Sequence, residues 1–210
     1  MVLLDFDGTI ADTGPGISQC VEYAAAYFGK RDLTQEEKKA FVGPPLKQSF
    51  AEFFGLEGDD IMTAIAKYRE CYNAGAMYNF TLYDGIRELV KKLNAAGIKV
   101  VMASSKPAVF VNRILEHLGM SGNFDYIACP AADGVDKSKY EMIAESLEHF
   151  GTGPEKAVMV GDRHFDIDGA KAAGVYSIGA AYGYGTEEEL VSAGADFIAK
   201  SVSDIYSFVF

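Results

Sequence analysis

Basic residues are scarce in this sequence relative to acidic ones. The 210 residues include 30 Asp and Glu but only 19 Lys and Arg, which gives a formal net charge of −11 at pH 7. A nucleic-acid binder needs a basic surface to displace counterions from phosphates, and an anionic membrane attracts basic segments. The composition therefore argues against both classes of partner. If the substrate is an anion, its positive partner must be local: a metal ion or one or two lysines.

Cysteine and long apolar runs are also limited. The three cysteines, Cys20, Cys71 and Cys129, stand far apart with no C-x-x-C pair, so we expect reduced thiols packed as small hydrophobic residues. No apolar run approaches the roughly 18–20 residues that a membrane span needs. The opening MVLLDFDG has no basic leader and already carries Asp5, which argues against a secretory signal. We therefore expect a soluble, cytoplasmic protein.

One short apolar run stands at the start of the chain. After Asp84, further short apolar runs alternate with segments of helical pattern. Hydrophobic residues make up 49% of the sequence, and no low-complexity tract interrupts the pattern. We expect Asp84 to be the N-cap of the helix that follows it. Strands separated by helices predict an α/β fold, a doubly wound parallel sheet with helices on both faces. The predicted strands cover 2–4, 98–103, 126–129, 157–162, 175–180 and 196–199.

The segment between the first strand and Asp84 has a different character. Its apolar residues recur at helical spacing, no strand pattern interrupts them, and Thr34 and Glu37 fit a capping box. We expect about four helices here. The sequence therefore predicts a Rossmann-like core formed by residues 1–13 and 83–210, with an inserted helical domain over residues 14–82.

Polar residues cluster immediately after the predicted strands. Because ligands bind outside the carboxyl ends of the strands in an open parallel sheet, these positions are the informative ones. Two lysines, either of which can serve the same edge, open the helix after the third strand. The residues concerned are Asp5 and Asp7, Ser104, Ser105 and Lys106, Lys137 and Lys139, and Asp162 and Asp166.

This combination of residue types indicates phosphoryl chemistry. Carboxylates close together repel one another unless a cation holds them, and oxygen-only ligands suit Mg2+. A metal ion, a lysine and a serine hydroxyl together match a phosphoryl group, and a carboxylate can attack phosphorus to form an aspartyl-phosphate. Asp5 and Asp7 can then divide the roles of nucleophile and general acid/base. Each feature alone is also typical of a solvated turn acid, a helix cap or a surface lysine, but their repetition at consecutive strand ends is not.

Several segments resemble the haloacid dehalogenase superfamily. DFDGTIADTGPGI resembles its first motif, D-x-D-G-T; VMASSKP resembles the second, a strand ending in Ser or Thr; and VMVGDRHFDIDGAKAAG resembles the fourth, GD-x-x-x-D. The C-terminal YGYGTEEELVSAGADFIAKS and the internal GPPLKQSF are similar to the phosphoglycolate phosphatase-like branch, in which the second segment lies in a helical cap. The resemblance covers nearly the whole chain.

The resemblance implies a role for each matching residue. Asp5 would be the nucleophile and a magnesium ligand. Asp7 would be the general acid/base and would bind magnesium through its backbone carbonyl. Ser104 would hydrogen-bond the transferring phosphoryl group, with help from Ser105. Gly43, in the segment similar to the cap, would contact the substrate together with Pro44.

The remaining implied residues complete the metal and phosphate sites. Asp162 would bind magnesium, and Asp166 would bind it directly or lie just behind the ligands. The third motif often reads K-P-x-P in this branch, whereas the chain has DKSKYEMI. The SK-x-x-M-I variant favours Lys139 as the residue that neutralises the phosphoryl oxygens, with Lys137 as the alternative.

The predicted function is therefore a Mg2+-dependent phosphatase. Dehalogenases of the superfamily lack an acid at the position of Asp7, whereas the alkoxide leaving group of a phosphate ester needs a proton. A cap of about 70 residues predicts a small phosphorylated metabolite as substrate: phosphoglycolate first, nucleoside 5′-monophosphates next and pyrophosphate third. A phosphomutase and a receiver-like phospho-accepting module are the alternative functions.

Overall fold

The chain divides into two compact units. The computed structural model describes residues 1–30, 33–131 and 137–210. One unit, here the core unit, comprises Met1–Ala11 and Leu82–Phe210; the other, the insertion unit, comprises Asp12–Thr81. The predicted insertion, 14–82, begins and ends within two residues of this unit. Two short strands, β2 (Ala11–Asp12) and β3 (Thr81–Leu82), pair with each other where the chain passes between the units.

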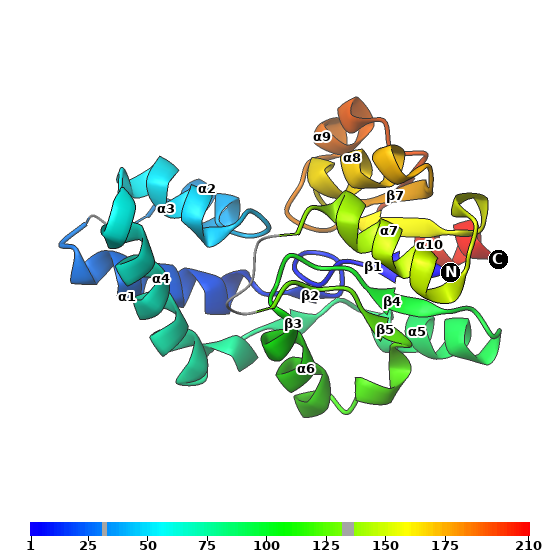
Figure 1. Cartoon of the computed structure of the whole chain (residues 1–210), viewed down its shortest axis with the longest axis horizontal. Coiled ribbons are helices and arrows are strands. Elements are labelled where there is room, and N and C mark those ends of the chain that lie inside the picture. Colours follow the sequence, from blue (N-terminus) through cyan, green and yellow to red (C-terminus); the bar gives the residue numbers. More distant parts are fainter. Residues whose placement is uncertain (31–32, 132–136) are drawn as a thin grey trace. The chain divides into compact units, whose positions relative to one another are not determined.

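A six-stranded sheet organises the core unit (Figure 1). All neighbouring strands run parallel. Every residue of the three central strands is buried, as expected for short apolar runs covered on both faces. In spatial order the strands are β5 (Tyr126–Ile127), β4 (Val100–Met102), β1 (Val2–Leu4), β6 (Val158–Gly161), β7 (Tyr176–Ala180) and β8 (Phe197–Ala199).

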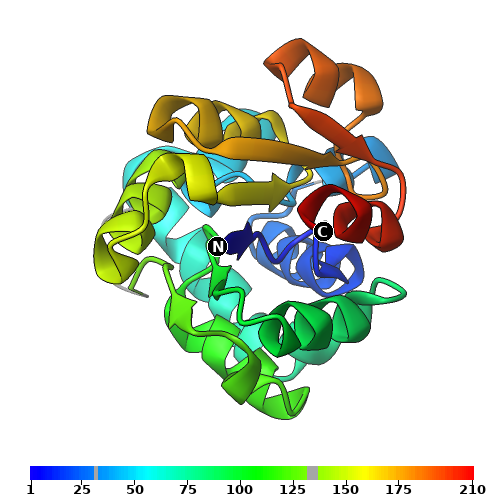
Figure 2. The same cartoon turned by 90° about the vertical axis from the view of Figure 1, so that its right-hand side faces the viewer.

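Helices cover both faces of this sheet, which confirms the doubly wound α/β fold. One group comprises α5 (Ile86–Ala95) and α6 (Ala108–His117), and the other comprises α7 (Lys139–Phe150), α8 (His164–Ala173) and α9 (Glu187–Ala193), in which α8 packs against both α7 and α9. Figure 2 shows α7 and α8, in yellow and gold, on the left of the strands and α5, in green, on their right. The strand order reverses at β1, so right-handed crossovers carry the two groups of helices to opposite faces. Both chain ends lie on the side of the core unit that faces the viewer in Figure 2.

Two local features differ from the sequence prediction. Asp84 is not the N-cap of α5; that position is held by Gly85, whose φ of 87° places it in the left-handed region that glycine adopts without steric cost. A further helix, α10 (Val202–Val209), follows the last strand and packs against α5 and β8. At eight residues it is too short to show a clear helical period, but a capping box between Ser201 and Asp204 marks its start.

The insertion unit contains the four α-helices that the sequence predicted. The capping box of Thr34 and Glu37 is present at the start of the second helix. The rings of Phe41 and Phe50 pack between the second and third helices, with their centroids 5.5 Å apart. Helix α1 packs against α4. The helices are α1 (Gly14–Tyr27), α2 (Gln35–Ala40), α3 (Leu46–Phe54) and α4 (Gly58–Asn73), followed by a 3-10 turn, η1 (Ala76–Tyr78).

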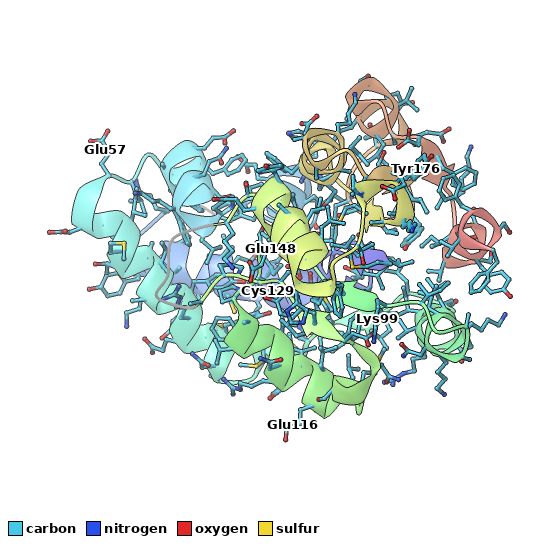
Figure 3. All side chains as sticks on the ribbon, turned by 45° about the vertical axis from the view of Figure 1, so that its right-hand side comes forward. Glu57, Lys99, Glu116, Cys129, Glu148 and Tyr176 are labelled. Carbon is cyan, nitrogen blue, oxygen red and sulfur yellow. The ribbon has the colours of Figure 1, made fainter. Side chains whose placement is uncertain are left out.

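The cysteines behave as small core residues, as predicted. Cys20, Cys71 and Cys129 are free and buried. Figure 3 shows Cys129 among other side chains, whereas the exposed Glu116 points away from α6 into solvent. Burial raises the pKa of the Cys129 thiol to about 12, so this thiol is protonated at neutral pH. Over the described residues, the helices are all too short or too polar to cross a membrane.

Candidate active site

The parallel register brings three predicted site residues to one edge of the sheet. Leu4, the last residue of β1, pairs with Met102 of β4 on one side and with Val160 of β6 on the other. The chain continues from these strands into Asp5, Ser104 and Asp162. The Asp5 N–H donates to the carbonyl of Val160 at 3.0 Å, which fixes Asp5 against β6, the strand that leads into Asp162.

Three buried carboxylates meet at this edge, here called the acidic trio: Asp5, Asp162 and Asp166. One oxygen from each lies within 4.8 Å of the others, and their exposed fractions are 5%, 1% and 1%. Burial, reinforced by the charges of Asp166 and Asp5, raises the pKa of Asp162 well above its usual value. Burial likewise raises the pKa of Asp166 to about 6 against the opposing effect of Lys139. The trio is therefore electrostatically strained when all three carboxylates are ionised and no metal ion is bound.

Lys139 supplies the ammonium group that contacts the trio. Its Nζ lies 2.8 Å from Oδ1 of Asp5 and 2.8 Å from Oδ1 of Asp166, and it donates to the carbonyl of Ala103 at 2.8 Å. Burial alone would lower the pKa of Lys139, but the carboxylates of Asp166 and Asp5 together raise it above the ordinary value. Lys139 is the first residue of α7, and the capping box of Ser138 and Glu141 fixes the start of that helix.

Lys137, the alternative lysine, is engaged elsewhere. Its Nζ contacts Oε2 of Glu145 at 2.6 Å, and its side chain is 36% exposed. Lys137 precedes the N-cap of α7, so it does not share the inward direction of the first helical residue. Of the two lysines that the sequence offered, the structure brings Lys139 to the trio.

Asp7 lies outside the trio and has its own lysine. Lys106 Nζ is 3.1 Å from Oδ1 of Asp7, and both residues are buried. Sequence reasoning placed Lys106 at the sheet edge but gave it no role. Its position directly after the second motif was the available signal. Ser104, predicted to bind the phosphoryl group, is 1% exposed, and its Oγ accepts a 3.4 Å hydrogen bond from the N–H of Lys106.

The trio has the donor set of a site for a hard divalent cation. Asp162 Oδ1 is buried and makes no hydrogen bond within the described chain, whereas its Oδ2 accepts the N–H of Tyr184 at 2.8 Å. Four carboxylates and two ammonium groups surround this edge, which leaves a formal charge of −2 when all are ionised. A site with only oxygen ligands and a formal charge of −2 fits Mg2+. Asp5, Asp162 and Asp166 are the side chains that would hold it.

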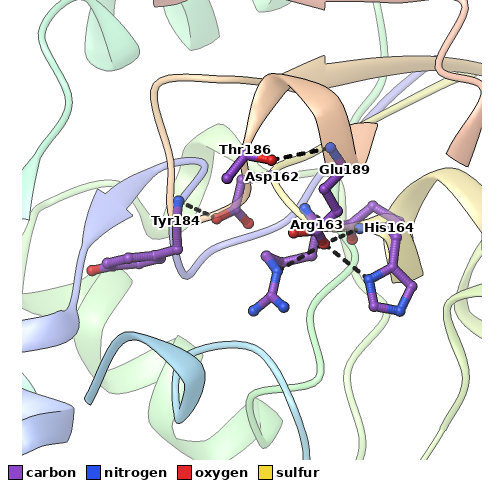
Figure 4. A network of polar contacts seen from close by, with 7 residues as sticks. Asp162, Arg163, His164, Tyr184, Thr186 and Glu189 are labelled. Carbon is purple, nitrogen blue, oxygen red and sulfur yellow. Dashed lines mark hydrogen bonds and ion pairs between the residues drawn. The ribbon is translucent and has the colours of Figure 1, made fainter. Parts of the chain in front are cut away.

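A polar network fixes the loop that carries Asp162 (Figure 4). Glu189 Oε1, from α9, accepts hydrogen bonds from Arg163 Nε at 3.0 Å and from the backbone N–H of His164 at 2.9 Å. The N–H of Arg163 donates to Oδ2 of Asp166 at 3.1 Å. The His164 ring also contacts Glu189 at 2.9 Å. This loop is therefore bound both to α9 and to the trio.

The other predicted substrate-binding residues lie after β4 or in the insertion unit. Ser105 is half-buried in the turn between Ser104 and Lys106. Gly43 and Pro44 lie in the insertion unit, between α2 and α3. Their contact with a substrate, like the magnesium contact of the Asp7 carbonyl, stays a prediction.

Comparison with known proteins agrees with this geometry. Residues 2–180 match the family model for haloacid dehalogenase-like hydrolases. A 5′-nucleotidase of Pseudomonas aeruginosa is 35% identical over 90% of this chain and 86% of its own length. The tyrosine-protein kinase PtkA of Mycobacterium tuberculosis is 34% identical over 98% of this chain and 67% of its own length. A phosphoglycolate phosphatase of Vibrio parahaemolyticus is 26% identical over the whole chain and 95% of its own length.

The fold also matches solved structures. The crystal structure of a predicted phosphatase from Clostridium acetobutylicum superimposes with a TM-score of 0.93 at 37% identity, covering 99% of this chain and 96% of that one. The match of the family model across most of the chain agrees with the motifs at the ends of β1, β4 and β6. The chain therefore belongs to the haloacid dehalogenase-like hydrolase family, as its motifs predicted.

Proposed function

We propose that this hydrolase is a Mg2+-dependent phosphatase that cleaves a small phosphate monoester through an aspartyl-phosphate intermediate. The observation that carries the proposal is the contact of Lys139 Nζ with both Asp5 and Asp166 at 2.8 Å within the acidic trio. A buried ammonium group and a divalent cation at the same carboxylates suit the several anionic oxygens of a phosphoryl group. The 5′-nucleotidase and phosphoglycolate phosphatase relatives support this reaction class.

Asp5 is the proposed nucleophile. Its carboxylate attacks phosphorus, so that a bond from Asp5 to phosphorus forms as the ester P–O bond breaks. Lys139, already in contact with Asp5 Oδ1, neutralises charge on the phosphoryl oxygens, and the hydroxyl of Ser104 donates a hydrogen bond to them. Mg2+, when bound by the trio, supplies further positive charge at the same oxygens.

Asp7 is the proposed general acid/base. It gives a proton to the leaving alkoxide and then takes one from the water that hydrolyses the aspartyl-phosphate, which releases inorganic phosphate and restores Asp5. The contact of Lys106 Nζ with Asp7 Oδ1 at 3.1 Å holds this carboxyl group in one orientation. The two acids of the D-x-D motif thus have different partners and different proposed roles.

The insertion unit is the proposed cap and the source of substrate selection. Its four helices and the segment around Gly43 and Pro44 resemble the cap of the phosphoglycolate phosphatase-like branch. Among the predicted substrates, the 35% identity to a 5′-nucleotidase supports nucleoside 5′-monophosphates, alongside phosphoglycolate and then pyrophosphate. Three free, buried cysteines support a reducing compartment, the cytoplasm, as the place of action.

A panel of phosphorylated compounds tests the proposal. The purified protein with Mg2+ is incubated with 2-phosphoglycolate, nucleoside 5′-monophosphates, pyrophosphate and phosphotyrosine, and released phosphate is measured as kcat/KM. We expect release from small monoesters, with no requirement for a bisphosphate and with loss of activity after chelation. Absence of release from every compound by folded, metal-loaded protein would contradict the proposal. Transfer of the phosphoryl group from Asp5 to a sugar instead of to water would indicate a phosphomutase. An aspartyl-phosphate that persists would indicate a phospho-accepting module.

A further inference from the structure

The segment after β7 contacts Asp162 through its backbone. Gly183, Tyr184 and Gly185, here called the Gly-Tyr-Gly loop, lie 21 to 23 positions beyond this acid in the sequence. The N–H of Tyr184 donates to Oδ2 of Asp162 at 2.8 Å, and Figure 4 shows the bond reaching the carboxylate from the loop. The GYG pattern therefore has a structural partner within the acidic trio.

The loop lies so close to Asp162 that only glycine fits at positions 183 and 185. A Cβ at Gly183 would lie 2.4 Å from Cβ of Asp162 and 2.3 Å from the carbonyl oxygen of Gly8. A Cβ at Gly185 would lie 2.0 Å from the carbonyl oxygen of Asp162. Real Cβ atoms do not approach backbone oxygens this closely, so any side chain here would push the loop away from Asp162.

The other side of the same carboxylate is closed by the first motif. Gly8 has a φ of +80°, and a Cβ there would lie 2.0 Å from Oδ2 of Asp162. Backbone from two distant segments therefore encloses Oδ2, and the Tyr184 N–H occupies it. Oδ1 is left buried without a hydrogen-bond partner in the described chain. One carboxylate oxygen of Asp162 lies within 4.8 Å of an oxygen of Asp5 and an oxygen of Asp166.

We propose that the Gly-Tyr-Gly loop is a metal-selectivity element that holds Asp162 as a one-oxygen ligand. With Oδ2 enclosed, only Oδ1 can reach a metal ion. Mg2+ binds six single oxygens in a tight octahedron, whereas Ca2+ takes six to eight and readily uses both oxygens of a carboxylate. A carboxylate restricted to one oxygen therefore favours Mg2+ over Ca2+. The inference rests on the proposed function in that Asp162 is one of the proposed magnesium ligands.

Titration calorimetry of metal binding tests this role without measuring catalysis. Gly183→Ala is compared with Gly122→Ala, a matched control in which the added methyl group has no neighbour within 4 Å and φ lies outside the left-handed region. Wild type and Gly122→Ala should bind Mg2+ more tightly than Ca2+. Loss of a partner of a ligating carboxylate typically weakens metal binding by about 10–100-fold, and we expect Gly183→Ala to lose Mg2+ affinity in this range.

The Ca2+ titration decides the selectivity claim. Since Oδ2 becomes available in Gly183→Ala, Ca2+ affinity should fall less than Mg2+ affinity. Equal losses for both ions, unchanged affinities in folded Gly183→Ala, or a wild type that prefers Ca2+ would each overturn the proposal. Phosphate release is measured separately, so a protein that binds Mg2+ as expected but cleaves no ester would overturn the proposed function alone.

A measurement on the wild type covers the case in which Gly183→Ala fails to fold. Hydrogen exchange of the Tyr184 amide, followed by NMR with and without Mg2+, reports its bond to Asp162 directly. We expect strong protection in both states, since the bond leaves Oδ1 for the ion. An amide that exchanges as freely as one in solvent when Mg2+ is saturating would overturn the proposal.

Discussion

Lys106 Nζ lies 3.1 Å from Oδ1 of Asp7, so the two acids of the D-x-D motif are paired with two different lysines. Asp5, two positions earlier, contacts Lys139 at 2.8 Å. Lys106 follows β4 and Lys139 opens α7, so each acid meets a lysine from a different part of the fold. This separation gives the two carboxylates different surroundings, and different surroundings are what a nucleophile and a general acid/base require.

Asp5→Asn should abolish phosphate release. An amide is not a nucleophile toward phosphorus and supplies no anionic ligand to a metal ion, although it keeps the size of the carboxylate. The measurement is phosphate release in the steady state, with acid-quenched protein examined for covalently bound phosphate. Turnover within about tenfold of wild type, far less than the usual loss for a missing catalytic group, would remove the nucleophile assignment.

Asp7→Asn should slow the reaction in a way that depends on the leaving group. General acid/base groups contribute about 10²–10⁴-fold, so alkyl phosphates should lose at least that much. A nitrophenyl ester needs little protonation of its leaving group, so its first step should suffer least and phosphoenzyme should accumulate on Asp5. Single-turnover bursts with both substrates provide the measurement. Equal losses in the first step, with no burst, would show that Asp7 is not the acid.

Lys139→Met should destabilise the protein far more than Lys137→Met. Removing one partner of a buried ion pair costs about 3–5 kcal/mol, because uncompensated carboxylates stay buried. The Lys137–Glu145 pair is exposed enough that its loss should cost no more than about 1 kcal/mol. Urea unfolding without added metal gives both free energies, and activity assays should show a loss only for Lys139→Met. Similar behaviour of the two variants would contradict the placement of Lys139 in the trio.

Magnesium should raise the melting temperature of the wild type and leave that of Asp162→Asn nearly unchanged. The ion binds only the folded state, where it relieves repulsion among the trio carboxylates. Because the pKa of Asp162 is raised, its ionised form is unfavourable in the folded protein, so metal-free Asp162→Asn should be at least as stable as wild type. Thermal unfolding with Mg2+ or with a chelator provides the comparison. A Mg2+ shift of full size in Asp162→Asn would exclude this residue as a ligand.

Metal-free wild type should lose stability from this site as the pH rises from about 4 to 6. The pKa of Asp166 is raised to about 6 in the folded protein, against about 3.9 in the unfolded chain. Because the pKa is higher in the folded state, that state holds the Asp166 proton more tightly than the unfolded chain does. The contribution of this proton to the free energy of unfolding is complete below the unfolded pKa and is lost as the pH rises through the folded pKa. Urea unfolding across this range, with Asp166→Asn as the control that lacks the titrating group, should show the difference. Parallel pH profiles for the two proteins would contradict the expectation.

Local patterns in the sequence were sufficient for the fold and for most of the candidate site. The apolar runs that become β1, β4 and β6 are buried on both faces, and a parallel arrangement places the residues after them at one edge. Asp5, Ser104 and Asp162 could therefore be predicted together without coordinates. The helical period of residues 14–82 likewise predicted the four helices of the insertion unit.

Tertiary structure decided what depends on contacts between distant segments. The contact of Lys139 with Asp5, the pairing of Lys106 with Asp7, and the bond from Tyr184 to Asp162 each join residues 22 or more positions apart. Periodicity and capping patterns report interactions within a few residues, and they carry no information on which side chains meet across elements. The GYG segment shows the limit: in the sequence it is a turn with two glycines, and only packing against Asp162 shows why neither glycine can carry a side chain.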